Sequence, residues 1–476
     1  MNRMSLKLFN TLSRKKETFK PLHAKEIRLY TCGPTVYNYA HIGNLRTYIF
    51  EDILERTLLW DGYKVKRVMN ITDVGHLTGD ADEGEDKIEK EARAEKKTPL
   101  QIAAFYTKAF LRDLKSLNIN IPKVLAPATK FVPEGIALIQ QLVKKKYAYE
   151  TSQAVYFDVR RFKNYGKLSR QSLAQKLVAA RKEVVTDLEK RNPADFALWF
   201  KLTGKFKNHL MHWSSPWGEG FPGWHVECSA IARKFLGQPI DIHTGGVDHI
   251  GTHHTNEIAQ SEAAYGKPLA RYWLHGEFLI IDARRMGKSE GNFITVSDLE
   301  KKGFAPLAYR YLLLNVHYRG KLNFSWDSLA GAQAGLMALY DKYADLRKSA
   351  RGKKYGITAN MRAYLDAFTE TLNDDLNTPK ALVVLGRVLK DSLLSEGQKA
   401  TLLERMDEVL GLDFKGSTKT KAKTPLIPTE VRELVRKREE ARRSKQFIQA
   451  DALRVEVDRL GYVVDDTPKG PVVRRK

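Results

Sequence analysis

Apolar and polar positions follow two different periods along the first part of the chain. Residues 26–34 alternate between apolar and polar side chains and end at Gly33-Pro34, which predicts a β-strand. Residues 43–63 carry apolar side chains three and four positions apart, as in an amphipathic helix, and residues 63–72 predict a second strand. A strand, a helix and a strand at this spacing indicate the start of a parallel α/β sheet.

This pattern is interrupted and later resumes. Between residues 122 and 213 a helix at 133–149 and a basic polar stretch predict an insertion into the α/β domain. The sheet pattern then returns with a strand, a helix and a strand at 238–246, 254–266 and 271–281.

Beyond about residue 326 the pattern is helical almost throughout. Four amphipathic segments predict a helical bundle: 328–348, 361–376, 379–394 and 397–412. Residues 415–428, rich in Lys, Thr and Pro, are typical of a linker. A last charged helix is expected to run to Leu460, where Gly461 can cap it.

Length and charge extend this picture. A chain of 476 residues exceeds what one hydrophobic core usually organises, so several domains are expected. The net charge of +24 favours a polyanionic partner such as a nucleic acid, although a merely soluble basic protein has the same composition. No apolar run approaches the roughly 20 residues that span a bilayer, so no membrane association is expected. Two cysteines make no secreted disulfide framework, which predicts a cytoplasmic protein; the basic N-terminus leaves an organelle-targeting role open.

The two cysteines suggest a metal site. Cys32 ends the first strand, Cys228 lies far along the chain, and His253 and Glu257 stand one helical turn apart. Two thiolates, an imidazole and a carboxylate suit tetrahedral zinc, and without a CxxC pair they could meet only at one rim of the folded sheet. Two ordinary half-buried thiols are the alternative reading. Four other histidines compete as ligands on the same criterion: His225, His243, His249 and His254.

Two stretches suit phosphate chemistry. His41-Ile42-Gly43-Asn44 stands between a strand and a helix, where backbone amides and the helix dipole attract anions. Residues 282–293 form a polar, glycine-bearing stretch in which Lys288 could swing onto a triphosphate; a solvated surface loop is the plain alternative. Neither stretch has the spacing of a P-loop. A nucleotide would therefore be held by two segments distant in sequence.

Together these stretches resemble one family. Residues 41–44 resemble the HIGH signature of class I aminoacyl-tRNA synthetases, and residues 285–289 resemble their KMSKS signature. Further segments resemble cysteinyl-tRNA synthetases in particular: 32–44, 70–74, 221–230, 253–263, 286–293, 373–382 and 441–454. The resemblance covers nearly the whole chain. It implies an α/β, Rossmann-like parallel-sheet catalytic domain with an inserted connective domain, followed by an α-helical bundle that binds the anticodon region and a small C-terminal segment.

The expected boundaries follow from combining the resemblance with the pattern. In chain order they are 1–121 for the first half of the catalytic domain, 122–213 for the connective insertion, 214–326 for the second half and a junction, 327–414 for the tRNA-binding bundle, 415–428 for the linker and 429–476 for the C-terminal anticodon-region segment.

The resemblance also implies an active-site metal. It assigns one zinc ion (Zn2+) per chain to Cys32, Cys228, His253 and Glu257. In the family this ion binds the substrate thiolate directly. Zinc lowers the pKa of a thiol enough to deprotonate it near neutral pH, whereas a serine hydroxyl gains far less and binds more weakly. Serine would therefore be rejected without an editing domain.

The resemblance further implies an ATP site and a cysteine pocket. His41, Asn44 and Lys288 would be catalytic, and Mg2+ would accompany ATP. The ATP-binding residues would be His41, Gly43, Asn44, Arg285, Met286, Gly287, Lys288 and Ser289, and the cysteine-binding residues Cys32, Thr72, Trp224, His243 and Asp248. Asn44, Arg285 and Gly287 depart from the signatures, which puts the rate in doubt more than the reaction type.

The function expected from the resemblance is ligation of L-cysteine to tRNA(Cys) through a cysteinyl-adenylate, by a monomer. One alternative is an ATP-dependent ligase that joins cysteine to an amino sugar; it would not need the helical residues after Trp326. Another is a non-catalytic, zinc-containing RNA-binding protein, which would have no use for Lys288 and His41.

Overall fold

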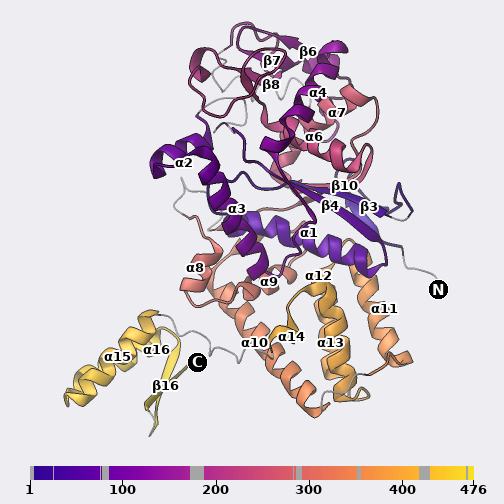
Figure 1. Cartoon of the computed structure of the whole chain (residues 1–476). Coiled ribbons are helices and arrows are strands. Elements are labelled where there is room, and N and C mark those ends of the chain that lie inside the picture. The colour runs from indigo at the N-terminus through magenta and orange to yellow at the C-terminus, as the bar shows by residue number, and fades with distance from the viewer. Residues whose placement is uncertain are drawn as a thin grey trace.

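A five-stranded parallel sheet lies at the centre of the computed structural model (Figure 1). Its strands, in spatial order, are β11 (Ala270–Gly276), β10 (Ile240–Gly246), β3 (Glu26–Thr31), β4 (Lys64–Ile71) and β5 (Val124–Pro127). All four pairings are parallel, which confirms the predicted α/β class. The structure describes residues 5–24, 26–75, 77, 85–171, 187–281, 284–285, 292–350, 355–417, 429–467 and 470–475.

The order of the strands determines where a ligand can bind. From β3 the chain continues outward through β4 and β5, and it later returns on the other side of β3 with β10 and β11. Strand order therefore reverses between β3 and β10. In open parallel sheets ligands bind beyond the carboxyl ends of the strands at such a switch point. Cys32 directly follows β3 at this position.

Helices cover both faces of the sheet, as its apolar strands require. On one face, Ile27 and Leu29 of β3 pack in the same apolar cluster as residues of α1 (Ile42–Trp60). On the other face, Tyr30 belongs to a cluster with residues of α6 (Trp224–Leu236) and α7 (His253–Tyr265). Neighbouring residues of β3 thus point to opposite sides, and the cysteines belong to the second cluster.

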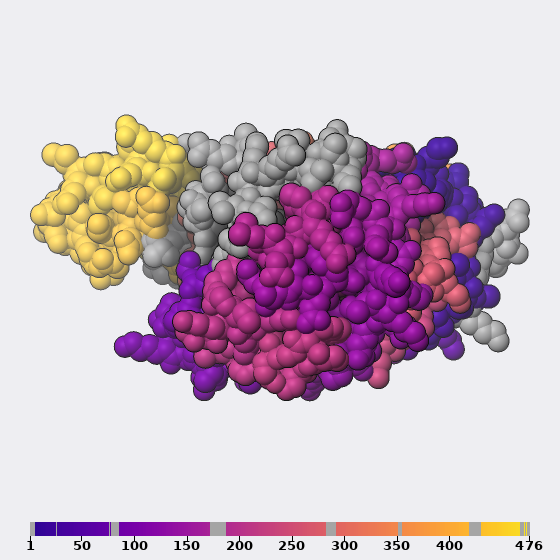
Figure 2. Space-filling model, turned by 90° about the horizontal axis from the view of Figure 1, so that it is seen from above, coloured from indigo at the N-terminus to yellow at the C-terminus, as the bar shows by residue number. Residues whose placement is uncertain are grey.

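The insertion is built around an antiparallel sheet and the helix α4 (Val132–Lys144). The sheet's strands are β6 (Ala148–Glu150), β7 (Ala154–Phe157), β8 (Phe196–Lys201) and β9 (Gly220–Pro222). Seen from above, residues of this region, in purple and magenta, cover much of the near face (Figure 2).

The sheet boundaries differ from those expected at 121/122 and 213/214. β5 lies within the range predicted as insertion but belongs to the parallel sheet, and β9 lies beyond that range but belongs to the inserted sheet. Both strands are only three or four residues long. Runs this short carry too little periodicity to assign to a sheet, because the pairing partner decides.

The strand expected at 271–281 also divides. β11 ends at Gly276, and the next three-residue strand joins a separate small sheet. That sheet contains β12 (Leu279–Ile281), β13 (Arg284–Arg285) and β14 (Leu322–Phe324). The remaining elements around the sheet domain are β1 (Lys7–Asn10), β2 (Lys15–Thr18), α2 (Lys87–Glu95), α3 (Pro99–Ser116), α8 (Val296–Lys301), α9 (Pro306–Leu314) and the 3-10 turns Ala128–Phe131, Val159–Arg161, Gly204–Phe206 and Val247–Ile250.

The predicted helical region is confirmed and is fastened to α1. Its helices are α10 (Trp326–Ser349), α11 (Ala359–Asn373), α12 (Thr378–Lys390), α13 (Glu396–Leu410) and α14 (Phe414–Ser417). Arg310 of α9 is fully buried and donates to Asp52 of α1 at 2.6 Å and to the Leu410 carbonyl at 2.7 Å. Because a buried charge needs such partners, Arg310 links α13 of the bundle to α1.

The C-terminal part differs from the single helix expected to Leu460. It contains α15 (Thr429–Arg443), α16 (Phe447–Arg459) and a hairpin of β15 (Tyr462–Thr467) and β16 (Gly470–Arg475). Between the helices Lys445 has a φ of 60°, which ends the first helix inside a continuous charged pattern. Val431, Val435, Val457 and Val464 form a small core of their own. None of the described helices is long and apolar enough to cross a membrane.

Candidate active site

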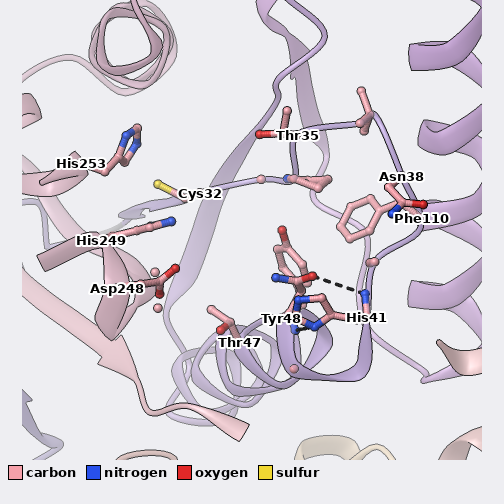
Figure 3. Close-up of a pocket in the computed structure, with 18 of the residues that line it drawn as sticks. Cys32, Thr35, Asn38, His41, Thr47, Tyr48, Phe110, Asp248, His249 and His253 are labelled. Carbon is pink, nitrogen blue, oxygen red and sulfur yellow. Dashed lines mark hydrogen bonds between the residues drawn. The ribbon is translucent and has the colours of Figure 1, made fainter. Parts of the chain in front are cut away.

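A cavity of about 430 Å³ lies at the carboxyl ends of β3 and β10. Cys32, Cys228 and His253 line one end, and His41 and Asn44 at the start of α1 line the other. Figure 3 shows Cys32 and His253 on one side of this space and His41 on the other. The thiol and phosphate candidates of the sequence therefore face one cavity.

The four predicted metal ligands come together at the first end. The donor atoms of Cys32, Cys228, His253 and Glu257 all lie within 4.8 Å of one another, and all four residues are buried. Cys32 follows β3, Cys228 lies in α6, and the other two stand one turn apart on α7. Such a buried Cys/His group could bind a metal ion.

A second donor group overlaps the first. Cys32, His243, His254 and Glu257 satisfy the same distance criterion. Two of the four competing histidines are thus within reach of Cys32. Of the other two, His225 places its Nδ1 3.0 Å from Nδ1 of His253, so it contacts a candidate ligand.

The carboxylate of Glu257 is oriented as a metal ligand would be. Its Oε1 lies 3.0 Å from Nε2 of His253, yet it lacks a hydrogen bond of good alignment. Its Oε2 is 3.0 Å from Nε2 of His243. One oxygen is therefore held by a hydrogen bond, while the other lies close to the His253 nitrogen without one. This is the arrangement expected of two ligands and one supporting contact.

The charges of the cluster also suit a cation. Burial opposes ionisation of Glu257, but the nearby His243 and His253 hold its pKa well below the usual range. Burial would lower the pKa of His253, but the charges of Glu257 and Cys228 raise it to about 10. Burial raises the pKa of Cys32. At Cys228 burial also acts to raise the pKa, but the hydrogen bond with Cys32 and the charge and hydrogen bond of His253 together lower it to about 6. The Glu257 carboxylate and the Cys228 thiolate thus lie buried beside a protonated His253. A metal ion could take the place of that proton.

The start of α1 is built from local contacts. His41 is the N-cap: its Nδ1 accepts from the backbone N–H of Asn44 at 3.1 Å, and Oδ1 of Asn44 accepts from the backbone N–H of His41 at 3.3 Å. A Cβ on Gly43 would lie 2.9 Å from Nδ1 of His41. Glycine is therefore needed here because the imidazole folds back over it, a reason the sequence did not indicate.

The same contacts define the state of the His41 ring. Burial lowers its pKa to about 4, against the opposing charge of Asp248. The ring is thus neutral near pH 7, and because Nδ1 accepts, its proton resides on Nε2. The ring can donate this proton in a hydrogen bond.

Of the five residues expected in the cysteine pocket, three line the cavity and two do not. Besides Cys32, Trp224 and Asp248 are in its wall. Thr72 and His243 are buried behind the wall. Thr72 donates to Oε2 of Glu227 at 2.8 Å, and His243 bonds to Glu257. Each of these two residues therefore contacts a buried glutamate and does not face the cavity.

Other residues line the cavity although the sequence did not mark them. Tyr37 and Asn38 come from the segment between Cys32 and His41, and Lys87 and Phe110 come from α2 and α3. Tyr37, between the two predicted site residues Cys32 and His41, could have been predicted to line the cavity. Nothing in the pattern of the helices singles out Lys87 or Phe110, because their position depends on how α2 and α3 fold over the sheet.

The second predicted phosphate-binding segment lies mostly outside the described residues. Of residues 282–293, the structure describes the backbone of Arg284 and Arg285, in β13, and the residues Asn292 and Phe293, of which Phe293 lines the cavity. The predicted ATP-binding residues Met286, Gly287, Lys288 and Ser289 lie outside the described residues.

Comparison with known proteins identifies relatives over almost the whole chain. A family model described as "tRNA synthetases class I (C) catalytic domain" matches residues 18–334, and one described as "Cysteinyl-tRNA ligase anticodon binding domain" matches residues 424–474. A cysteine--tRNA ligase of Treponema denticola is 44% identical over 97% of this chain and 98% of the relative. Cysteine--tRNA ligase 1 of Burkholderia lata is 46% identical over 98% and 96%.

Solved structures agree at the level of the fold. A Mycobacterium tuberculosis methionyl-tRNA synthetase in complex with methionyl-adenylate superposes with a TM-score of 0.55 at 15% identity, covering 82% of this chain and 90% of that one. An Agrobacterium radiobacter LeuRS–tRNA complex gives a TM-score of 0.58 at 12% identity, covering 84% and 85%. These identities are too low to carry more than the architecture.

Proposed function

The chain belongs to the cysteine--tRNA ligase family of class I aminoacyl-tRNA synthetases, and from that premise we propose how its residues carry out the reaction. The protein is an ATP-dependent ligase that activates L-cysteine and transfers it to tRNA. The amino-sugar ligase and the non-catalytic RNA-binding protein are not supported, because relatives named as cysteine--tRNA ligases match nearly the full length and an anticodon-binding model matches the C-terminal part.

The observation that carries the residue assignment is the buried donor group beside the cavity. Zinc fits the group of Cys32, Cys228, His253 and Glu257 better than the overlapping one, since two thiolates are its preferred ligands. Cys32, Cys228 and His253 also line the cavity, whereas His243 and His254 do not. When bound, zinc would take up the substrate thiol and lower its pKa, so that cysteine binds as a thiolate and serine does not.

The rest of the cavity would align the adenylation step. The carboxylate oxygen of cysteine attacks the α-phosphorus of ATP, and the bond to the bridging oxygen breaks to release pyrophosphate. The Nε2–H of His41, which lines the cavity, would donate to an α-phosphate oxygen, and the positive end of the α1 dipole would attract the phosphate. Lys288 would neutralise the departing pyrophosphate. Mg2+ would accompany ATP as the counter-ion of its phosphates.

The second step transfers the cysteinyl group. The terminal ribose hydroxyl of tRNA(Cys), the 2′-OH in this class, attacks the adenylate carbonyl and releases AMP. Asp248, in the cavity wall, would hold the substrate ammonium group. Residues 429–475 together with the bundle would hold the anticodon arm, in keeping with the net charge of +24. We expect the protein to act as a monomer.

Pyrophosphate exchange and tRNA charging test the proposal together. The full chain should catalyse cysteine-dependent, serine-independent ATP–pyrophosphate exchange and should charge tRNA(Cys). A chain ending at residue 417 keeps the bundle that Arg310 fastens to α1 and should retain exchange. Its charging of tRNA should fall by roughly a hundredfold, because contacts to the anticodon arm are lost. Undiminished charging by the shortened chain would refute the role given to residues 429–475.

A further inference from the structure

Tyr30 is a buried phenol beside the donor cluster that the reaction above does not use. It lies on β3 two residues before Cys32, on the sheet face that packs against α6 and α7. Its ring centroid lies 5.1 Å from that of His243 on the adjacent strand. The residue is fully buried, in the same apolar cluster as Cys32 and Cys228.

The hydroxyl of Tyr30 has no well-formed hydrogen bond. Buried polar groups in folded proteins are nearly always paired, and an unpaired hydroxyl is costly. Other buried tyrosines of this chain are paired: Tyr272 donates to the Thr18 carbonyl at 3.1 Å and Tyr309 to the Ile42 carbonyl at 2.7 Å. Tyr30 therefore has an unused donor in the interior.

The surroundings of this hydroxyl are the candidate metal ligands. Burial and then the charges of Cys228, Cys32 and Glu257 raise the pKa of Tyr30 well above its ordinary value. The phenol keeps its proton and acts as a donor. Among these charges that of Cys228 has the largest effect, and the hydroxyl also interacts with its thiol without forming a proper hydrogen bond.

A metal-loaded cluster would need such a donor. Two thiolates and a carboxylate outweigh the charge of one zinc ion, and a bound substrate thiolate adds further negative charge. Excess charge in the interior is tolerated only where hydrogen bonds compensate for the lost water. His243 already does so for Glu257 through its contact of 3.0 Å with Oε2. Cys228 has the Tyr30 hydroxyl beside it.

We propose that the Tyr30 hydroxyl donates a hydrogen bond to the Cys228 thiolate of the zinc-loaded enzyme and so stabilises and orients this ligand. The proposal rests on the zinc centre proposed above. Tyr30 is then a positioning residue that acts through Cys228. Without the ion, the unpaired hydroxyl lowers the stability of the protein; with the ion, it stabilises a metal ligand. Removing the hydroxyl should therefore raise the stability of the metal-free protein and lower its affinity for zinc.

Tyr30→Phe tests this with two readouts that do not depend on activity. In competition with a chelator, the variant should bind zinc roughly 10–100-fold more weakly, as expected when a supporting hydrogen bond to a ligand is lost. The metal-free variant should unfold at the same or a higher temperature than the metal-free parent, because it no longer buries an unpaired hydroxyl.

Tyr272→Phe is the matched control, since it removes a paired hydroxyl from β11 of the same sheet. It should lower the unfolding temperature and leave zinc affinity unchanged. Unchanged zinc affinity in Tyr30→Phe would overturn the proposal. So would a loss of affinity accompanied by an equal loss of stability in the metal-free chain, because the hydroxyl would then serve packing alone.

Cobalt substitution locates the bond. Loss of a hydrogen bond to a thiolate raises its electron-pair energy, so the sulfur-to-cobalt charge-transfer band of Tyr30→Phe should move to longer wavelength. In a Cys228→Ala background the Tyr30→Phe change should have no further effect on cobalt affinity; an equal effect in both backgrounds would refute the partner assigned here. A parent chain that binds no zinc would overturn the zinc centre and this inference together, whereas normal zinc binding with an unaffected Tyr30→Phe overturns the inference alone.

Discussion

The two ends of the cavity are built on opposite principles. The donor end takes Cys32 from the end of β3, Cys228 from α6, and His253 and Glu257 from α7. At the phosphate end, the start of α1 is formed within four consecutive residues, where His41 and Asn44 cap each other. The first depends on three elements meeting at the sheet edge, and the second on one helix start. Damage to one end should therefore leave the other assembled.

The largest expected effect is at the donor end. Cys228→Ala should reduce bound zinc from one ion per chain to a small fraction and slow cysteine-dependent pyrophosphate exchange by roughly a thousandfold or more, because a metal ligand and the substrate's anchor are lost together. Metal content and exchange rate are the measurements. His254→Gln is the control from the overlapping donor group. If His254→Gln loses the metal and Cys228→Ala keeps it, the ion occupies the other group.

A smaller loss is expected at the phosphate end from Lys288→Ala. Removing a charge that acts on the leaving pyrophosphate should lower the rate of adenylate formation by about a hundredfold, with cysteine affinity and zinc content nearly unchanged. Single-turnover kinetics and equilibrium binding separate the two quantities. Lys301→Ala, whose side chain is 75% exposed on α8, is the matched control. Equal losses of cysteine affinity and rate would contradict the assigned role.

Gly43→Ala sharpens the contrast further. The new Cβ would come within 2.9 Å of Nδ1 of His41, so the ring must move and adenylate formation should slow by about tenfold. Zinc content should not change. Gly331→Ala, in α10 with nothing within 4 Å of the added atom, should leave the rate unaltered. A loss of zinc in Gly43→Ala would show that the two ends are not independent.

The smallest effect concerns acid stability. His41 has a folded-state pKa of about 4, below its ordinary value, so the unfolded chain takes up the proton first. Its contribution to stability is present above about pH 6.5 and is lost as the pH falls toward 4. His41→Asn keeps an N-cap but removes the titration, so its unfolding temperature should fall less between pH 7 and pH 5, by roughly 1–2 °C. Identical pH profiles would refute the buried neutral state of His41.

Much of the fold could be predicted from the sequence because apolar residues recur at regular spacing in its helices and strands. The predicted helix at 43–63 corresponds to α1 at Ile42–Trp60, and the predicted strands at 26–34 and 63–72 correspond to β3 and β4. The short strands β5 and β9 were not predicted, and they lie on the other side of the expected boundaries 121/122 and 213/214. The break at Lys445 was missed because the charged helical pattern continues through it.

At the site, the sequence identified residue types and the structure decided their positions. The pattern and the resemblance pointed to Cys32, Cys228, His253 and Glu257, and the structure places their donor atoms within 4.8 Å. The resemblance put His243 in the cysteine pocket, which stays a prediction; in the structure His243 is buried outside the cavity lining and contacts Glu257 at 3.0 Å.

The sequence by itself determined what local chemistry can determine: the helix start at His41, the apolar periods of the sheet, the excess of basic residues and the supply of zinc-like donors. Each of these depends on neighbours within a few residues, and hydrogen bonding and periodicity act over that range. Only the tertiary structure decided which histidines face the cysteines, which side chains line the cavity, and that Tyr30 has an unpaired hydroxyl beside Cys228. Those facts depend on burial and on contacts between distant segments, which exist only once the sheet and its helices have packed.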